Sequence, residues 1–336
     1  MPTAVNSCVL CEGNRDGFRE FAGVRGWHYV RCVNCGLVFL DPQPTDTELT
    51  HFYNHGYRYD FARYQESIPK QYVWLEMLEG AAGSPGRLLE IGCSYGCFLS
   101  AARDRGWSAE GIELNKEAAN YARSTLKLSV TQGRVADLQG QSSARFDAVA
   151  AWHVLEHDPC PGTLVEDAYS LLRPGGILAL RVPNLDSTVA RLAGSCWQWL
   201  SPPEHVCMYT RSTLSRLLTK YKFEIVEWRT VRGNARNTWF EILRARTKLA
   251  INKGSLLHGT AKTEFSFDAP PMFQDRPWYR AAERVISIGA VPLDLLFNEN
   301  MRTQGREAEL AVVARKPVLD LIGERSGATE FEVPAR

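Results

Sequence analysis

Four cysteines near the start of the chain are spaced to bind one metal ion. Cys8 and Cys11 form one C-x2-C pair, and Cys32 and Cys35 form a second pair after 20 intervening residues. Two such pairs present four thiolates in a tetrahedron, which suits zinc, and a site closed by four sulfur ligands is structural. Four unrelated buried cysteines, or a redox pair, are alternatives that explain the paired spacing less well. The spacing therefore predicts a structural zinc module over residues 1–44.

A glycine-rich turn follows the apolar run at 87–91. Gly92 and Gly96 would let the backbone approach a ligand at the carboxyl end of a strand. A second apolar run ends in Glu113, whose carboxylate can accept hydrogen bonds from both hydroxyls of a ribose. No phosphate-binding Lys-Ser/Thr follows the turn, so we expect an adenosine compound without a diphosphate. We also expect that removing Glu113 weakens cofactor binding far more than folding.

A Glu-His pair at 204–205 follows a loop with two tryptophans and two prolines, which are bulky enough to wall an acceptor pocket. A histidine titrates near neutral pH, as proton removal from a hydroxyl or an activated carbon requires. We therefore predict that His205 is the general base and that Glu204 orients it. His157 is the second candidate base, with a structural or capping role as its alternative.

Short apolar runs that alternate with helical patterns must position these groups. Such alternation indicates βαβ units and a parallel sheet. A helix over about 213–220 and strands over 223–230 and 309–315 complete the predicted fold. The runs within the alternating part are 87–91, 109–113, 128–131, 146–151 and 176–182.

The chain divides into five predicted zones. The segment at 244–305 mixes leucines and isoleucines with basic residues. We predict a helical insertion packed beside the active site, with a surface for a membrane or a lipid-linked acceptor as the alternative. The zones are a zinc module at 1–44, a helical linker or lid at 45–83, the main domain at 84–243 and 306–316, the insertion at 244–305, and a loosely ordered tail at 317–336.

Charge and hydropathy limit the classes of partner. The 336 residues include 39 Lys and Arg and 38 Asp and Glu, a net charge of +1, which gives no field to attract a polyanion. A nucleic-acid partner is therefore not expected. No apolar run reaches the 18–20 or so residues of a spanning helix and no signal peptide is visible, so we expect a soluble, cytoplasmic protein. The sequence does not determine the oligomeric state.

Three motifs, taken in order, resemble those of class I methyltransferases. The segment EIGCSYG at 90–96 resembles their glycine-rich first motif, FDAV at 146–149 followed by HVLEH at 153–157 resembles their fourth strand, and LLRPGG at 171–176 resembles the turn before their fifth strand. The resemblance implies a Rossmann-like α/β sheet with helices on both faces and S-adenosylmethionine as cofactor. The zinc module, with GLVF after it, is similar to that of zinc-containing small-molecule methyltransferases, including sugar C-methyltransferases.

The same resemblance implies roles for individual residues. Trp152 could instead be a core aromatic, and two prolines replace the tyrosine that precedes the Glu-His pair in the sugar enzymes. The implied cofactor-binding residues are Glu90, Gly92, Cys93 and Gly96 on the methionine side, Glu113 at the ribose, and Val135 and Trp152 beside adenine. The candidate catalytic residues are His205, Glu204, His157 and Tyr209.

These observations predict an S-adenosylmethionine-dependent methyltransferase. Its acceptor would be a small hydroxylated metabolite (a sugar, a glycan precursor or a natural product), methylated on oxygen or carbon. The alternative is an RNA methyltransferase that uses the zinc module as an RNA clamp. The segment SPPE at 201–204 resembles the Pro-Pro motif of adenine-N6 enzymes, but it lacks the stacking aromatic and follows the fifth strand instead of the fourth. A non-catalytic cofactor-binding scaffold is a third alternative, which the glycine turn and Glu113 disfavour.

Overall fold

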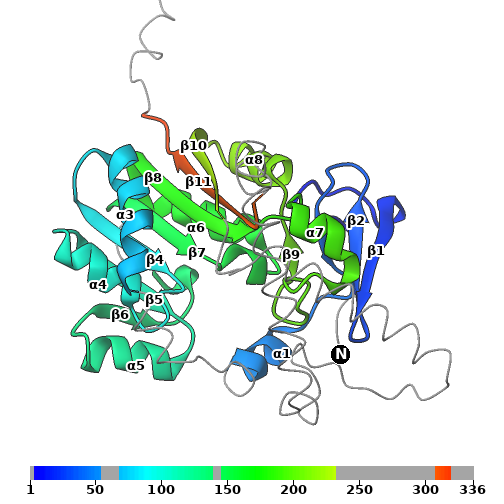
Figure 1. Ribbon diagram of the computed structural model, residues 1–336, viewed down its shortest axis with the longest axis horizontal. Helices are drawn as coiled ribbons and strands as arrows, with labels where there is room; N and C mark the ends of the chain where they lie inside the picture. Colours follow the sequence, from blue (N-terminus) through cyan, green and yellow to red (C-terminus); the bar gives the residue numbers. More distant parts are fainter. Residues whose placement is uncertain (1–3, 54–67, 139–144, 232–306, 319–336) are drawn as a thin grey trace, which may run out of the picture.

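The computed structural model describes residues 4–53, 68–138, 145–231 and 307–318. These residues form a seven-stranded sheet flanked by helices and, beside it, a smaller four-stranded sheet (Figure 1). The predicted insertion, its membrane-contact alternative and most of the predicted tail lie outside the described residues. No helix of the described part is long and apolar enough to span a membrane.

The large sheet has the strand order β10-β11-β8-β7-β4-β5-β6. The five strands from β8 to β6 in this order are parallel, whereas β11 runs antiparallel to both of its neighbours. The predicted α/β sheet is thereby confirmed, although β8 begins before its predicted start at 176. The strands are β4 (Arg87–Ile91), β5 (Ser108–Glu113), β6 (Ser129–Gln132), β7 (Phe146–Trp152), β8 (Leu172–Pro183), β10 (Glu224–Val231) and β11 (Glu309–Arg315).

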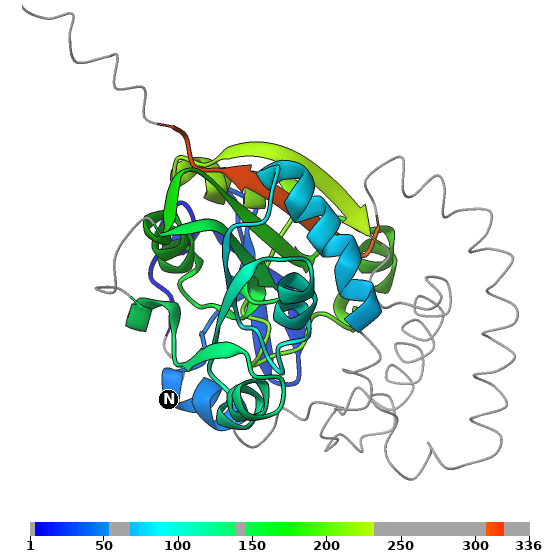
Figure 2. The same ribbon diagram turned by 90° about the vertical axis from the view of Figure 1, so that its left-hand side faces the viewer.

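Helices cover both faces of this sheet because its central strands alternate two apolar sets. In β7, Ala148 and Ala150 pack with the cluster beneath α3 and α4, while Val149 and Ala151 join the cluster on the opposite face. Figure 2 shows α3 crossing its face of the sheet. The helices are α3 (Ile68–Ala82), α4 (Cys97–Asp104), α5 (Lys116–Ser124), α6 (Pro161–Leu171), α7 (Thr188–Ala193) and α8 (Arg211–Lys220), with short 3-10 turns η1 (Arg15–Gly17), η3 (Val135–Leu138), η4 (Leu155–His157) and η5 (Gly194–Cys196).

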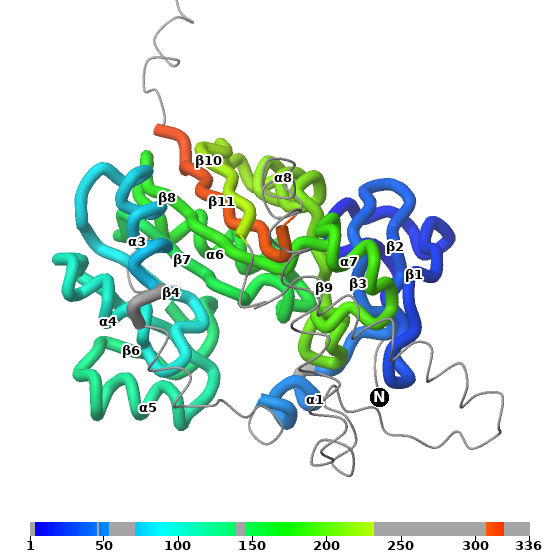
Figure 3. Tube along the Cα trace, in the orientation of Figure 1, coloured from blue at the N-terminus to red at the C-terminus, as the bar shows by residue number. Residues whose placement is uncertain are grey.

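The small sheet joins the N-terminal segment to the loop after β8. Its antiparallel strands are β1 (Phe18–Val24), β2 (Trp27–Cys32), β3 (Val38–Leu40) and β9 (Cys207–Met208), in that order (Figure 3). The Tyr29 hydroxyl, which is fully buried, donates a hydrogen bond of 2.7 Å to the carbonyl oxygen of His205. Buried residues of the small sheet and of one face of the large sheet belong to one core cluster. The cysteine module therefore helps to position the loop that carries the Glu-His pair.

Helix α1 (Asp46–His51) follows strand β3 of the small sheet along the chain. Its N-terminus has a capping box, in which the Thr45 hydroxyl accepts from the Glu48 backbone N–H at 3.2 Å and the Glu48 carboxylate accepts from the Thr45 N–H at 2.8 Å. This cap fixes where the helix starts. Leu49 can therefore face a cavity at the carboxyl ends of the parallel strands.

Candidate functional site

The four paired cysteines lie together at one end of the small sheet. The Sγ atoms of Cys8 and Cys35 are 3.5 Å apart, and those of Cys11 and Cys32 are 3.6 Å apart. All four ligand atoms lie within 4.8 Å of one another, so the cluster can hold a metal ion. The hydrogen bond from Cys35 lowers the pKa of Cys8 to about 5, so a thiolate forms there readily.

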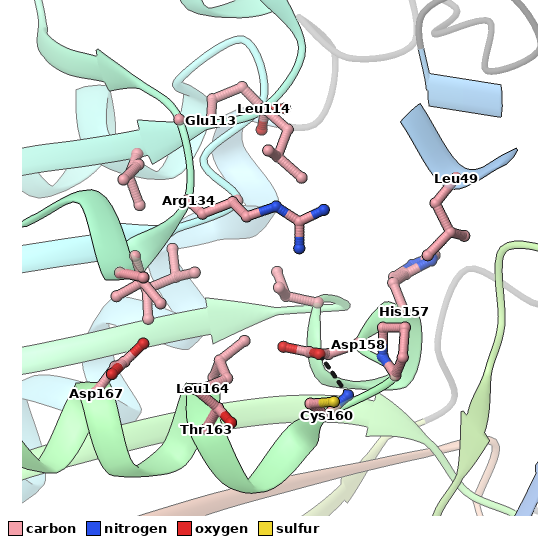
Figure 4. Close-up of a pocket in the computed structure, with 18 of the residues that line it drawn as sticks. Leu49, Glu113, Leu114, Arg134, His157, Asp158, Cys160, Thr163, Leu164 and Asp167 are labelled. Carbon is pink, nitrogen blue, oxygen red and sulfur yellow. Dashed lines mark hydrogen bonds between the residues drawn. The ribbon is translucent and has the colours of Figure 1, made fainter. Parts of the chain in front are cut away.

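A cavity of about 330 Å³ lies at the carboxyl ends of β4, β5 and β7 (Figure 4). Open α/β sheets bind ligands at this edge, and the volume is within the range of small-molecule sites. The cavity is lined by Leu49, Thr50, Tyr53, Ile91, Gly92, Ile112, Glu113, Leu114, Gly133, Arg134, Val135, Ala136, His153, Val154, His157, Asp158, Pro159, Cys160, Thr163, Leu164 and Asp167.

The glycine turn after β4 forms part of the cavity wall. Gly92 has φ +68°, and a Cβ there would lie 2.6 Å from Cγ2 of Val154. Gly96 has φ +83°, and a Cβ there would lie 2.5 Å from Cδ1 of Leu128. Both positions thus require glycine, the first beside the cavity and the second for packing of α4 and α5. Cys93, predicted to bind the cofactor, is buried and is not among the lining residues.

Glu113 lines the cavity and also holds the glycine turn. Its Oε2 accepts from the Ser94 backbone N–H at 2.8 Å, and its Oε1 accepts from the Asn115 N–H at 2.7 Å. Each carboxylate oxygen keeps a lone pair for a ligand hydroxyl. Burial raises the pKa of this carboxyl. The expectation that removing Glu113 weakens cofactor binding far more than folding stays a prediction, and two backbone donors depend on this carboxylate.

Glu90 is a buried carboxyl that lacks one hydrogen-bond partner. It is 4% exposed, and its Oε2 has no partner among the described residues. Burial and the nearby Glu113 carboxylate raise its pKa well above the ordinary value. Glu90 does not itself line the cavity, but it directly precedes Ile91 and Gly92, which do. A buried unpaired carboxylate oxygen favours a cationic or donor group nearby.

The structure places the two predicted adenine neighbours on opposite sides of the sheet. Val135 lines the cavity, as predicted. Trp152 does not line it: its ring packs against Trp74 and Phe98, with centroids 5.6 Å and 5.3 Å apart. Side chains alternate along a strand, so Trp152 shares the face of Ala150 beneath α3. This packing favours the alternative of a core aromatic over the expected contact with adenine.

The Glu-His pair is arranged differently from the prediction. The Glu204 carboxylate bonds to the Ser201 hydroxyl at 2.6 Å and does not contact His205, whose Nδ1 instead bonds to the Trp199 carbonyl oxygen at 2.7 Å. The Glu204 carbonyl oxygen bonds to Nδ1 of His157 at 2.9 Å. Glu204 thus orients His157 through its backbone. This contact between Glu204 and His157 forms only when the loop folds onto η4, because the loop and η4 are far apart in the sequence.

His157 lines the cavity, whereas His205 lies behind it. His205 is 5% exposed, and burial together with the His157 imidazole lowers its pKa to about 3. A base works best with a pKa near the operating pH, so this environment does not suit the predicted role of His205 as general base. Tyr209 is also buried away from the cavity, and its hydroxyl donates to the Leu155 carbonyl oxygen at 3.4 Å. Of the four predicted catalytic residues, His157 alone lines the cavity.

Two groups next to His157 were missed in the sequence. The HVLEH segment places His153 and Glu156 three residues apart, and Nδ1 of His153 lies 2.8 Å from Oε1 of Glu156. Nε2 of His153 is 3.5 Å from Glu309, which is also 3.5 Å from Nε of Arg181. The Trp199 ring is stacked against His153, with centroids 5.2 Å apart. The i, i+3 spacing was visible in the sequence, but Glu309 belongs to the last strand and was not predictable as a partner.

The opposite wall of the cavity carries further polar groups. Figure 4 shows the Arg134 side chain reaching into the space opposite His157 and Leu49. The Asp158 carboxylate lies beside them and accepts from the Cys160 backbone N–H at 2.7 Å. Burial raises the pKa of Glu156, but its hydrogen bond to His153 and the charges of nearby imidazoles outweigh this and lower it to about 2. The cavity thus has the Glu113 carboxylate on one side and the His157 imidazole, with the Asp158 carboxylate beside it, on the other.

Comparisons with known proteins agree with this geometry. The family described as "Methyltransferase domain" matches residues 61–228, half of the chain. A ubiquinone biosynthesis O-methyltransferase of Aromatoleum aromaticum is 30% identical over 122 residues, covering 35% of this chain and 51% of that protein. One from Xanthomonas campestris pv. campestris is 32% identical over 127 residues, covering 36% and 53%.

The chain spans about half the length of the curated relatives it matches. Among solved structures, a SAM-dependent methyltransferase from Archaeoglobus fulgidus is similar with a TM-score of 0.47 and 18% identity, covering 75% of this chain and 94% of that one. The family match, the strand order and the cavity at the carboxyl ends of the parallel strands agree with one another. The chain therefore belongs to the methyltransferase-domain family, the S-adenosylmethionine-dependent methyltransferases of class I fold.

Proposed function

We propose that this protein transfers a methyl group from S-adenosylmethionine to a hydroxyl of a small molecule. The observation that carries the proposal is one cavity with Glu113 at the cofactor end and His157 at the other. A methyltransferase needs both a site for adenosine and a polar group beside the acceptor atom. The curated relatives are named as O-methyltransferases, which supports oxygen as the acceptor atom.

The residues of the cavity fit this cofactor. Glu113 has lone pairs left to accept the ribose hydroxyls, and Leu114 and Val135 offer apolar contacts for adenine. The unpartnered Oε2 of Glu90 suits the ammonium group of the methionine portion. When bound, the cofactor supplies an electrophilic methyl group on a sulfonium. The protein then has to hold the acceptor in line and assist loss of its proton.

The acceptor would bind between η4 and α1. Leu49 and Tyr53 approach this end of the cavity from the segment after the small sheet, and His157 faces them, with the Tyr53 and His157 rings 6.1 Å apart. An apolar and aromatic wall opposite an imidazole suits a small hydroxylated metabolite. The sugar or glycan precursor predicted from the zinc module belongs to this class, as does a natural product or a lipid-linked acceptor.

We further propose that the four-cysteine cluster binds zinc and has no direct part in the transfer. Four thiolates close the coordination sphere, so no position remains for a substrate. The module shares a sheet and a buried core with the loop at 201–209. The metal would therefore stabilise that loop and, through the Glu204 carbonyl, the orientation of His157.

The test is a methyl-transfer assay with a labelled donor and two acceptor pools, a small-molecule extract and bulk RNA. We expect label in the small-molecule pool, and mass spectrometry of the product identifies the methylated atom. The variant His157→Ala should lower transfer by roughly 10²–10⁴-fold and leave cofactor affinity nearly unchanged. The control is His28→Ala, because the His28 side chain is 58% exposed on β2. Label only in RNA would instead support the alternative RNA methyltransferase.

A further inference from the structure

Glu156, His157 and His205 form a second cluster of metal-ligand type, which we call the three-ligand cluster. One ligand atom of each residue lies within 4.8 Å of the others. Glu156 and His205 are buried, while His157 lines the cavity. We infer that this cluster binds one divalent metal ion at the acceptor end of the cavity. The part of the inference that concerns the acceptor rests on the proposed function.

Both imidazoles of the three-ligand cluster already have the tautomer that a metal requires. Nδ1 of His157 bonds to the Glu204 carbonyl oxygen and Nδ1 of His205 to the Trp199 carbonyl oxygen. A carbonyl oxygen only accepts, so each Nδ1 carries the proton and each Nε2 keeps its lone pair. Metal-binding histidines in proteins are typically held by this kind of second hydrogen bond. The backbone of the 199–204 loop therefore orients both nitrogen ligands.

The carboxylate of the cluster has an oxygen left over. Oε1 of Glu156 is bonded to His153, but Oε2 is buried and has no partner among the described residues. The residue has no exposed surface, so bulk solvent does not reach this oxygen. A cation bound between Oε2 and the two Nε2 atoms would compensate it. Glu309 and Arg181 lie beyond His153 and hold that imidazole in place.

The donor set indicates the kind of ion and what it could do. Two imidazole nitrogens and one carboxylate oxygen suit Mn²⁺, Fe²⁺, Co²⁺ or Zn²⁺, and three protein ligands leave positions open for a substrate oxygen. Ligand atoms bonded at about 2.0–2.2 Å to one ion in a tetrahedral arrangement lie about 3.3–3.6 Å apart, so ligand atoms that lie within 4.8 Å of one another have to approach by about 1.5 Å at most.

The open positions would face the acceptor, because His157 is the member of the cluster that lines the cavity. A hydroxyl bound to a divalent ion ionises at a lower pH than a free one, and its proton passes to water. The ion would then activate the acceptor oxygen in place of a histidine base, which agrees with the burial of His205 behind the cavity. An acceptor with two neighbouring oxygens, which can occupy two open positions, is the class that this arrangement favours.

The test uses the whole chain carrying one equivalent of zinc, which the four thiolates bind first, and adds Mn²⁺ alone, with binding followed by electron paramagnetic resonance. Mn²⁺ prefers nitrogen and oxygen ligands to thiolates, so the four-cysteine cluster does not compete. We expect one bound Mn²⁺ per chain, and at least a tenfold rise in Kd in both Glu156→Gln and His205→Asn. Glu156→Gln can keep the hydrogen bond to His153 and should therefore remain folded. It serves as the test variant if His205→Asn proves unstable. The controls Glu110→Gln and His28→Asn should bind Mn²⁺ as the wild type does.

Two outcomes overturn the inference. One is a wild-type Kd for Mn²⁺ above about 1 mM, and the other is unchanged Mn²⁺ affinity in folded Glu156→Gln. Calorimetry with S-adenosylhomocysteine separates this failure from failure of the proposed function. Cofactor binding without a metal site leaves the methyltransferase proposal intact. A metal site without cofactor binding supports the inference and removes the proposed function.

Discussion

Glu113 offers the sharpest test of how the cofactor site is built. The Glu113→Gln variant keeps the size of the side chain but removes its charge and one acceptor oxygen. A hydrogen bond to a charged group contributes about 1.5–3 kcal/mol, so the Kd for S-adenosylhomocysteine should rise by roughly 10- to 100-fold. Isothermal titration calorimetry measures this change directly.

The same variant should also lose stability, because Glu113 accepts from two backbone donors. An amide can accept at only one atom, so either the Ser94 or the Asn115 N–H loses its partner. A buried donor without a partner costs about 1–3 kcal/mol, and the cost is smallest if the amide oxygen serves buried Ser94 and water reaches Asn115. Glu113→Ala should lose more, because both donors then lack a partner. Urea unfolding compares the two variants.

Glu110→Gln is the matched control on the same strand. The Glu110 carboxylate pairs with Arg87 at 2.9 Å and with Arg145 at 3.6 Å, and it is not among the cavity-lining residues. Its Kd for S-adenosylhomocysteine should match that of the wild type. An unchanged Kd in folded Glu113→Gln would refute the assignment of the ribose site. Equal stability of the Ala and Gln variants would refute the structural role given to the two backbone hydrogen bonds.

Three further outcomes are expected. Elemental analysis should find about one zinc per chain, and a Cys32→Ser, Cys35→Ser double variant should lose that zinc and unfold at a lower temperature; stoichiometric zinc in it would exclude the site. Gly92→Ala should lose about 1–2 kcal/mol of stability and much of its cofactor affinity, because φ is positive at this position and the new Cβ would meet Val154. Urea unfolding measures the stability and calorimetry the affinity. An unchanged stability and affinity would count against this account. Burial raises the pKa of Glu113, and the cofactor needs its carboxylate, so protons compete with the cofactor for this group. Calorimetry across pH should show that cofactor affinity begins to fall at a pH above the ordinary carboxyl range and falls further on acidification. The Glu113→Gln variant should abolish this pH dependence.

Hydrophobic periodicity was enough to predict the large sheet. The strands at 87–91 and 309–315 were predicted with the bounds that the structure has, because strands buried on both faces are short apolar runs. The glycine turn and Glu113 were also predictable, since a turn and the strand ends beside it are local features. Residues 54–67 and 232–306 lie outside the described residues, so the predictions for the lid and the insertion stay predictions.

The end of the cavity at His157 depends on contacts that no local pattern encodes. The pairing of β3 with β9 brings Tyr29 against the His205 carbonyl, and the loop that follows β8 then places the Glu204 carbonyl on His157. A Glu-His pair adjacent in sequence thus serves two different imidazoles in space. The side on which Trp152 lies follows from strand alternation, but the face that becomes the cavity is decided by packing of helices against the sheet.

The sequence by itself therefore determined the α/β sheet, the cysteine pairs and the glycine turn beside Glu113, because each rests on spacing within one or two neighbouring elements. The tertiary structure alone decided that His157 reaches the cavity, that His205 is buried behind it, and that Glu156 joins them. The physical reason is that burial, hydrogen-bond partners and pKa depend on groups contributed by distant segments.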